Sequence, residues 1–241
     1  MTTKDLIHYE SETAIGILGG TGCIIKVEGL YHLYYCVFED QPQRQYVCHA
    51  TSTDLTNWTK YPDETFGPDE SIYLLTDWRD PHVIWNEEEK CWWMILCAQN
   101  QGNTKRRGCV GLCKSADLHH WTCCEPLYAP QSSMSAYECP DLFYMNGWWY
   151  LVFSQFTDRF QTLYRMSRSC NGPWIRPKTD SFDGRAFYAA KTCSDGEHRY
   201  IFGWSPTRTQ NTWNFDPDPT HEGYDYKTYD WGGSLVPHEI Y

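Results

Sequence analysis

One pattern recurs four times along the sequence, and this internal repeat constrains the fold more than any other feature. Each copy has a short apolar strand, a polar turn and then a strongly aromatic strand. The copies are GTGCIIKVEGLYHLYYC, RDPHVIWNEEEKCWWMILC, ECPDLFYMNGWWYLVFS and RAFYAAKTCSDGEHRYIFGW. Turns such as Asn146-Gly147 and Ser194-Asp195-Gly196 predict that each copy forms a β-hairpin.

A second element follows three of these hairpins. It reads STDLTNWTK from Ser52, SADLHHWTC from Ser115 and SRSCNGPWIRP from Ser167. Ser-x-Asp-Leu followed by Trp predicts a strand that ends in a tight turn, with the Trp over the outer edge of the unit. Each unit therefore supplies at least three antiparallel strands, and no helical period persists.

Small sheets repeated along a chain are typical of propeller blades. We therefore expect an all-β fold, a five-bladed β-propeller that forms a single domain over residues 1–241. The fifth blade is expected to combine the C-terminal WGGSLVPHEIY with strands from the N-terminal segment, because joining the termini removes an open sheet edge. A β-sandwich with long loops is the alternative, but it does not explain the repeat.

Charge and hydropathy exclude several classes of partner. The net charge of -11 argues against nucleic acid, and the basic cluster Lys105, Arg106 and Arg107 is best interpreted as a solvated loop. The N-terminal MTTKDLIHYESETAIG has no apolar run, and no stretch approaches the roughly 20 apolar residues of a membrane span. The sequence thus predicts a cytoplasmic protein without a signal peptide.

Twelve cysteines are present, and we expect reduced thiols without disulfides. The densest group comprises Cys109, Cys113, Cys123 and Cys124, near His119 and His120. Zinc is one interpretation, but no paired C-x-x-C is present, so buried thiols are favoured over a metal site. No metal and no cofactor are predicted.

The innermost strand of each blade starts at the central channel of a propeller. The residues at these starts are Gly20, Asp80 and Glu138 in the first three units, with Asp183 and Arg185 in the fourth. Two carboxylates and an arginine in one pocket suit a carbohydrate, whose hydroxyls accept and donate hydrogen bonds. The expected partner is therefore a small-molecule carbohydrate.

Glycoside cleavage normally uses one protonated carboxyl group and one carboxylate. Glu138, between Tyr137 and Cys139, is predicted to lie in an apolar setting that suits the acid role. Asp80 precedes Pro81, so the alternative for this residue is a simple turn. The aromatic residues expected to line the pocket are Trp78, Tyr137, Phe187, Tyr188 and Trp204.

Several longer motifs carry a family resemblance. They are Tyr31-His32-Leu33-Tyr34-Tyr35, His49-Ala50-Thr51-Ser52-Thr53-Asp54-Leu55 with Trp58, Trp78-Arg79-Asp80-Pro81, Tyr137-Glu138-Cys139-Pro140-Asp141-Leu142-Phe143, Asp183 to Ala190, and Leu235-Val236-Pro237-His238-Glu239. In this order they resemble glycoside hydrolase family 32, which comprises invertases, levanases and inulinases. The resemblance covers nearly the whole chain.

The resemblance implies a five-bladed propeller and a β-fructofuranoside substrate. It implies that Glu138 is the general acid/base. It also implies that Asp80 stabilises the oxocarbenium-like transition state, with Arg79 beside it.

Two departures concern the sugar subsite. Gly20 stands at the position of the family's nucleophilic Asp, and Cys36 stands at the position of a Gln. We expect Gly20 to leave a vacancy of about the size of a carboxymethyl group.

The family's C-terminal β-sandwich is also absent. Three interpretations stay open: a complete minimal protein, a piece of a longer one, or half of a two-chain assembly. The corresponding partners are a second copy of the chain or a second chain that replaces the sandwich.

Three functions compete at this point. An enzyme with an altered mechanism would admit a water where the carboxylate stood, or would take its base from Asp69, Glu70 or Asp40, although a solvated loop charge is the favoured interpretation of each. A non-catalytic sugar-binding propeller is the second hypothesis, because loss of a nucleophile greatly slows covalent catalysis. An interaction scaffold is disfavoured, since it does not require the carboxylate pair.

Overall fold

The computed structural model describes residues 2–10, 14–102, 104–134, 136–157, 160–184, 186–207 and 230–241. Within these residues the chain is almost entirely β, and its only helix is a 3₁₀ turn, η1, at Pro62–Glu64. No helix in the described part of the chain is long and apolar enough to cross a membrane.

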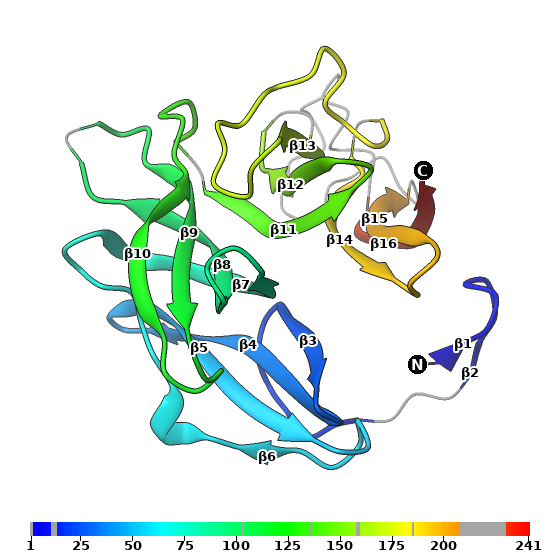
Figure 1. Cartoon of the computed structure of the whole chain (residues 1–241), viewed down its shortest axis with the longest axis horizontal. Coiled ribbons are helices and arrows are strands. Elements are labelled where there is room, and N and C mark those ends of the chain that lie inside the picture. Colours follow the sequence, from blue (N-terminus) through cyan, green and yellow to red (C-terminus); the bar gives the residue numbers. More distant parts are fainter. Residues whose placement is uncertain are drawn as a thin grey trace, which may run out of the picture.

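The repeat forms four antiparallel sheets (Figure 1). The first sheet contains β3 (Gly22–Val27), β4 (Leu30–Asp40), β5 (Gln43–Ser52) and β6 (Thr59–Lys60), and the second contains β7 (Tyr73–Asn86), β8 (Cys91–Asn100), β9 (Gly108–Ser115) and β10 (Thr122–Tyr128). The third contains β11 (Tyr137–Met145), β12 (Trp148–Gln155) and β13 (Gln161–Ser167), and the fourth contains β14 (Tyr188–Ser194), β15 (Arg199–Thr207) and β16 (Asp230–Ile240). Each predicted hairpin is thus confirmed.

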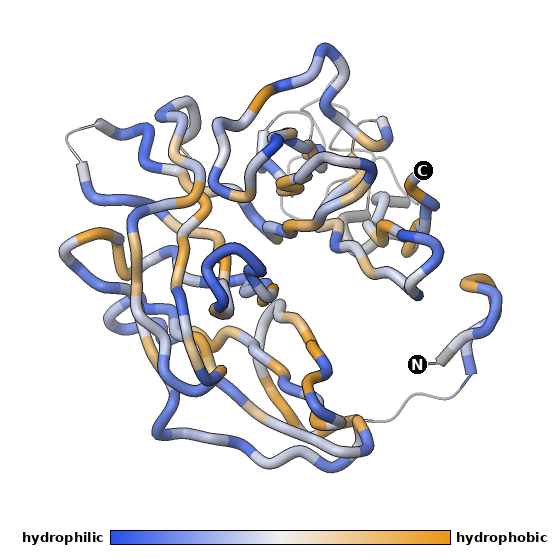
Figure 2. The backbone as a smooth tube through the Cα atoms, in the orientation of Figure 1, coloured by the Kyte–Doolittle hydropathy of each residue, from blue (hydrophilic) through white to orange (hydrophobic). Residues whose placement is uncertain are grey.

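The middle strands are apolar on both faces because each sheet packs between neighbours. Along β8, Leu96 lies in the core that the second sheet shares with Tyr34 of the first, whereas Ile95 lies in the core shared with Leu151 of the third. The third and fourth sheets meet in the same way around Val152. Figure 2 shows hydrophobic segments within these sheets and hydrophilic ones in many connecting loops. Successive side chains of one strand therefore pack into two different cores. This arrangement is typical of a propeller and not of a sandwich.

The Ser-x-Asp-Leu segments form the predicted tight turns. The Oγ of Ser52 accepts a hydrogen bond from Leu55 N at 2.9 Å, and Ser115 does the same for Leu118 N at 2.9 Å. Both leucines have positive φ, 63° and 69°, so the turn residue takes a left-handed conformation that the hydroxyl stabilises.

The predicted closure of the ring is wrong. Strand β16 pairs with β15, with Leu235 opposite Trp204, so the C-terminal segment completes the fourth sheet. At the N-terminus, β1 (Thr2–Thr3) and β2 (Tyr9–Glu10) pair with each other in a hairpin that stands apart from the four sheets (Figure 1). Among the described residues, no apolar core joins the fourth sheet to the first. A count of five blades and a single domain over residues 1–241 remain predictions.

Candidate active site

A cavity of about 360 Å³ lies beside the first residues of β11 and β14, the middle of β7 and the segment that precedes β3. Its lining residues are Gly20, Thr21, Phe38, Arg79, Asp80, Glu138, Cys139, Phe156, Tyr188, Ala189 and Trp204. All four sheets contribute, so the predicted convergence of Gly20, Asp80 and Glu138 on one pocket is observed.

The same backbone irregularity shapes three of the inner strands. Each has a β-bulge in which two residues oppose one residue of the next strand. The bulges consist of Asp80-Pro81 in β7, Cys139-Pro140 in β11 and Ala189-Ala190 in β14. Their first residues have positive φ, at 56°, 48° and 53°, which is unfavourable for a side-chain-bearing residue. Such strain at three matched positions is typical of a functional site.

The residues directly before these bulges meet in the cavity. Arg79 Nη2 donates to Glu138 Oε1 at 2.7 Å, and the Tyr188 hydroxyl donates to Glu138 Oε2. Burial, together with the neighbouring Glu138 carboxylate, raises the pKa of Tyr188, so its hydroxyl keeps its proton. The expected apolar setting of Glu138 is therefore wrong: the carboxylate has a donor on each oxygen, and its side chain is 24% exposed.

Asp80 is more than a turn residue before proline. Its Oδ2 accepts a hydrogen bond from Cys139 N at 2.9 Å, which ties the second sheet to the third. Arg79 Nε lies 3.9 Å from the same oxygen. Within the described residues, Asp80 Oδ1 accepts no hydrogen bond. Asp80 and Glu138 therefore share one guanidinium and open onto one cavity.

The space beside Gly20, which was expected to be vacant, is filled. A Cβ on Gly20 would lie 2.7 Å from Cys36 Sγ and 2.7 Å from Phe38 Cε2. Gly20 N also donates to Cys36 O at 2.7 Å, which holds the backbone against β4. The expected vacancy is thus wrong, and Cys36 lies fully buried behind Gly20 instead of lining the cavity.

Neither thiol near Gly20 is suited to act as a nucleophile. Burial raises the pKa of Cys36, and it raises the pKa of Cys139 well above its usual value. Both groups therefore stay protonated near neutral pH, and a thiol is a far weaker nucleophile than a thiolate.

Three predicted lining residues lie elsewhere. Trp78, Tyr137 and Phe187 are almost completely buried in the cores between sheets. Each directly precedes a residue that does line the cavity, namely Arg79, Glu138 and Tyr188. Successive side chains of a strand point to opposite faces, so these aromatics point away from the cavity. Tyr188 and Trp204 do line it, as predicted.

The other candidates that the structure describes do not line the cavity. Asp183 accepts a hydrogen bond from His238 Nε2 at 2.8 Å, and Arg185 lies outside the described residues. The three spare acids, Asp40, Asp69 and Glu70, are also absent from the cavity lining. Asp69, for example, accepts a hydrogen bond from Ser71 N at 2.9 Å in its own loop. Their expected role as a replacement base is therefore not supported by their positions.

Sequence reasoning missed several residues of the site. Phe38 lies two residues after Cys36 on β4, hence on the same face of the strand, and that alternation is a usable signal. Phe156 follows β12 and has no comparable signal. The support of Arg79 was also missed: its Nη1 donates to Asp77 Oδ1 at 2.5 Å, and Gln45 Oε1 accepts from Trp78 N at 2.8 Å.

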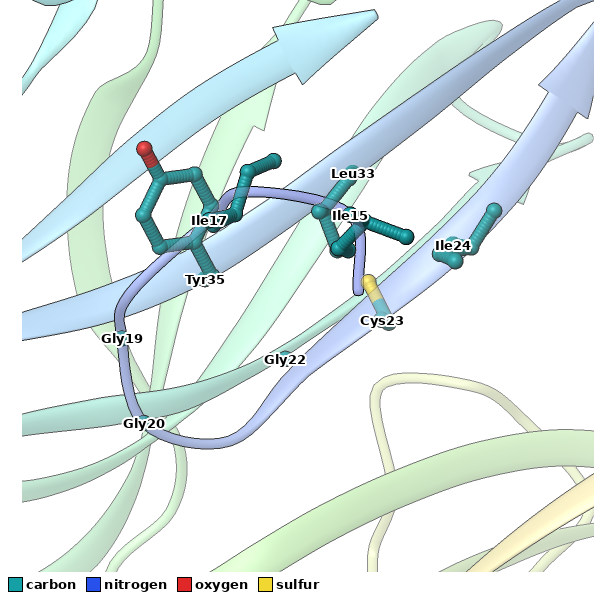
Figure 3. Close-up of a pocket in the computed structure, with 9 residues that line it drawn as sticks. All are labelled: Ile15, Ile17, Gly19, Gly20, Gly22, Cys23, Ile24, Leu33 and Tyr35. Carbon is teal, nitrogen blue, oxygen red and sulfur yellow. The ribbon is translucent and has the colours of Figure 1, made fainter. Parts of the chain in front are cut away.

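A second cavity, of about 420 Å³, lies beside Gly20 (Figure 3). It is formed by the segment 15–20 and the hairpin β3–β4, and its lining includes Ile15, Ile17, Leu33 and Tyr35. Among the described residues that line it, none carries a charged side chain. It therefore lacks the groups that acid-base cleavage of a glycoside requires.

The propeller and the two carboxylates of its central cavity are typical of glycoside hydrolase domains. Residues 1–225 match the family model for the glycosyl hydrolases family 32 N-terminal domain. The chain belongs to this family, as its motifs indicated.

Curated relatives agree with this assignment. Sucrose-6-phosphate hydrolase of Escherichia coli is 28% identical over 239 residues, which cover 84% of this chain and 47% of the relative. A levanbiose-producing levanase of Geobacillus stearothermophilus is 28% identical over 160 residues, which cover 64% of this chain and 34% of the relative. The chain thus spans half or less of the length of these relatives.

Solved structures share the fold. Sucrose-6-phosphate hydrolase of Lactobacillus gasseri superposes with a TM-score of 0.65 at 22% identity, covering 77% of this chain and 41% of the other. A β-fructofuranosidase of Bombyx mori gives a TM-score of 0.61 at 24% identity, covering 77% and 42%.

Proposed function

We propose that this chain acts on a β-fructofuranoside in the central cavity, with Glu138 as the acid and Asp80 as the stabilising carboxylate. The observation that carries the proposal is that these two carboxylates, from adjacent inner strands, share Arg79 and face one cavity. The substrate class follows from the relatives, which include sucrose-6-phosphate hydrolases, and from a Bombyx mori family member whose variant was solved in complex with sucrose.

The proposed reaction begins with the acid. Protonated Glu138 gives its proton to the glycosidic oxygen as the bond to the anomeric carbon breaks. For this step the leaving-group oxygen replaces either Arg79 or Tyr188 as the partner of the Glu138 carboxyl group. Asp80 then stabilises the positive charge that develops on the fructosyl ring, because its Oδ1 is not engaged by the described residues.

The second half of the reaction proceeds without a covalent intermediate. Gly20 offers no carboxylate, and Cys36 and Cys139 offer no thiolate. Water attacks the anomeric carbon instead and loses a proton, and Glu138 regains a proton from the solvent. Because covalent catalysis divides the barrier into two smaller ones, the rate is expected to fall several orders of magnitude below that of a family member with the nucleophile.

One observation favours the second candidate, a non-catalytic sugar-binding domain. Cys36 and the Phe38 ring occupy the space that the side chain of a nucleophile would need. A relic site would keep Asp80 and Trp204 for binding without cleavage.

The deciding experiment incubates the protein with sucrose, fructans and other glycosides and identifies products by mass. For the enzyme we expect fructose release that disappears in Glu138→Gln but persists in the exposed control Glu125→Gln. Asp40→Asn, which removes one of the loop acids, should also leave it unchanged. Sugar binding without release, lost in Asp80→Asn, would establish the binding domain. Release that survives Glu138→Gln would refute the assigned roles.

The remaining expectations belong to the same proposal. An assembly with a second copy or with a second chain stays a prediction. The twelve cysteines, which are all free thiols in the structure, suit a reducing compartment such as the cytoplasm.

A further inference from the structure

Away from the central cavity, two histidines and a glutamate meet between the first and second sheets. They are His49 on β5, Glu64 in η1, and His119 in the turn between β9 and β10. Glu64 Oε2 accepts from His49 Nδ1 at 2.6 Å, and Glu64 Oε1 accepts from His119 Nδ1 at 2.9 Å. One ligand atom of each residue lies within 4.8 Å of the other two.

The surrounding residues hold the cluster in place. The His49 ring stacks between Tyr34, at 4.6 Å, and Tyr61, at 5.2 Å between ring centroids. The hydroxyl of Tyr34 donates to Leu118 O at 2.6 Å, which fixes the backbone next to His119. His49 is buried, whereas Glu64 and His119 have side chains that are 20% and 36% exposed, so an ion can reach them.

A neighbouring histidine completes a proton relay. His32 Nδ1 lies 3.0 Å from His49 Nε2, so one proton is shared between these two nitrogens. While His49 Nδ1 donates to Glu64, its Nε2 is the acceptor and His32 the donor. If His49 Nδ1 instead binds a metal, the His49 proton moves to Nε2 and is donated to His32 Nδ1, while His32 moves its own proton from Nδ1 to Nε2. This hydrogen bond is the outer partner that metal-binding histidines commonly have.

We propose that His49 Nδ1, a carboxylate oxygen of Glu64 and His119 Nδ1 bind a divalent transition-metal ion, with Zn²⁺ as the best match, and that the ion joins the first sheet to the second. Two imidazoles and one carboxylate are common zinc ligands, and water takes the fourth position.

The geometry requires only small movements. Ligand bonds of about 2.0–2.2 Å at tetrahedral angles separate the ligand atoms by roughly 3.3 Å. The two histidine nitrogens now contact different oxygens of Glu64, at 2.6 and 2.9 Å, so the distance to the oxygen that binds the ion lengthens by less than 1 Å. The widest separation among the three ligand atoms, at most 4.8 Å, shortens by up to about 1.5 Å. Both histidines keep one proton by changing tautomer, so binding to the neutral rings releases no net proton. The sequence predicted no metal, because the three ligands come from separate segments and form no spaced motif.

The test titrates metal-free protein with Zn²⁺ under a non-chelating reductant and measures stoichiometry and affinity. We expect one ion per chain in the wild type. Affinity should fall at least about tenfold in His119→Ala and in Glu64→Gln. The matched control is His120→Ala, which removes the adjacent, 88% exposed histidine and should leave the affinity unchanged.

Two spectroscopic measurements identify which residues bind the ion. The spectrum of the Co²⁺-substituted protein should lack thiolate charge-transfer bands, because the proposed ligands are nitrogen and oxygen atoms. Such bands would instead indicate binding at the competing site, the pair Cys113 and Cys123 with sulfurs 3.6 Å apart. Imidazole nitrogen NMR of the wild type should show both His49 Nδ1 and His119 Nδ1 losing their protons on binding. Thiolate bands, unchanged affinity in both ligand variants, or the absence of stoichiometric binding would each overturn the proposal.

Discussion

The crowding at Gly20 gives a quantitative prediction. In Gly20→Ala, the new methyl group meets Cys36 Sγ and the Phe38 ring, each at 2.7 Å, well inside van der Waals contact. Phe38 is 53% exposed and its ring can turn outward, but Cys36 is fully buried and cannot. Overpacking of this kind destabilises a fold by about 1–3 kcal/mol. We expect the free energy of unfolding of Gly20→Ala to fall within that range.

A double-mutant cycle identifies the cause. Cys36→Ala removes the sulfur that obstructs the new methyl group, so Gly20→Ala combined with Cys36→Ala should be more stable than the sum of the single changes predicts, by about 1 kcal/mol. Urea denaturation of the four proteins measures this coupling. Strict additivity, or a Gly20→Ala variant as stable as the wild type, would refute the idea that the position is filled.

The same contact governs any attempt to restore the nucleophile. Gly20→Asp alone should give little sucrose hydrolysis, because its carboxylate lacks room. Gly20→Asp combined with Cys36→Ala should give more, since the buried sulfur is the obstacle that cannot move aside. Equal activity of the two variants would contradict this order.

Three further predictions concern the site and its supports. Tyr188→Phe removes a hydrogen bond to a charged group, worth about 1.5–3 kcal/mol, and should lower kcat/KM for a fructoside roughly 10- to 100-fold, whereas Tyr144→Phe at an exposed position should not. Arg165→Met breaks the buried ion pair with Asp180 at 2.7 Å and should lower the free energy of unfolding by about 3 kcal/mol. Arg176, which is exposed, also pairs with Asp180, and Arg176→Met should lower the free energy of unfolding by less than about 1 kcal/mol. Backbone hydrogen bonds lower the pKa of Asp54 below its usual 3.8. The stabilising effect of the Asp54 carboxylate is therefore present above pH 3.8 and is lost as the pH falls below it. The urea midpoint of Asp54→Asn should be lower than that of the wild type at pH 7, and the two midpoints should converge in acid.

Local patterns in the sequence predicted much of the fold. Turn residues and aromatic strands located the four hairpins, and the Ser-x-Asp-Leu segments located the outer turns. The predicted closure of the ring was wrong because β16 pairs with β15, the described strand that directly precedes it, and not with strands of the N-terminal segment.

The site was predicted in part for a similar reason. The motifs identified Arg79, Asp80 and Glu138, but the bulges that aim Arg79, Glu138 and Tyr188 at one point depend on pairing with the next strand. Strand alternation alone would have excluded Trp78 and Tyr137, which precede cavity residues by one position. Phe187 has an additional physical reason to be buried, since its ring lies against Gly203, where a Cβ would approach within 2.6 Å.

The central claim is that the cavity between Asp80, Glu138 and Tyr188 holds the fructosyl ring. The most direct measurement is a crystal structure of Glu138→Gln with sucrose bound, because the variant should bind without cleaving. We predict that the furanose ring lies in this cavity, with its hydroxyls on Asp80 and its anomeric oxygen next to residue 138. A sugar that occupies the apolar cavity between Ile15 and Tyr35 instead, with the central cavity empty, would contradict the account.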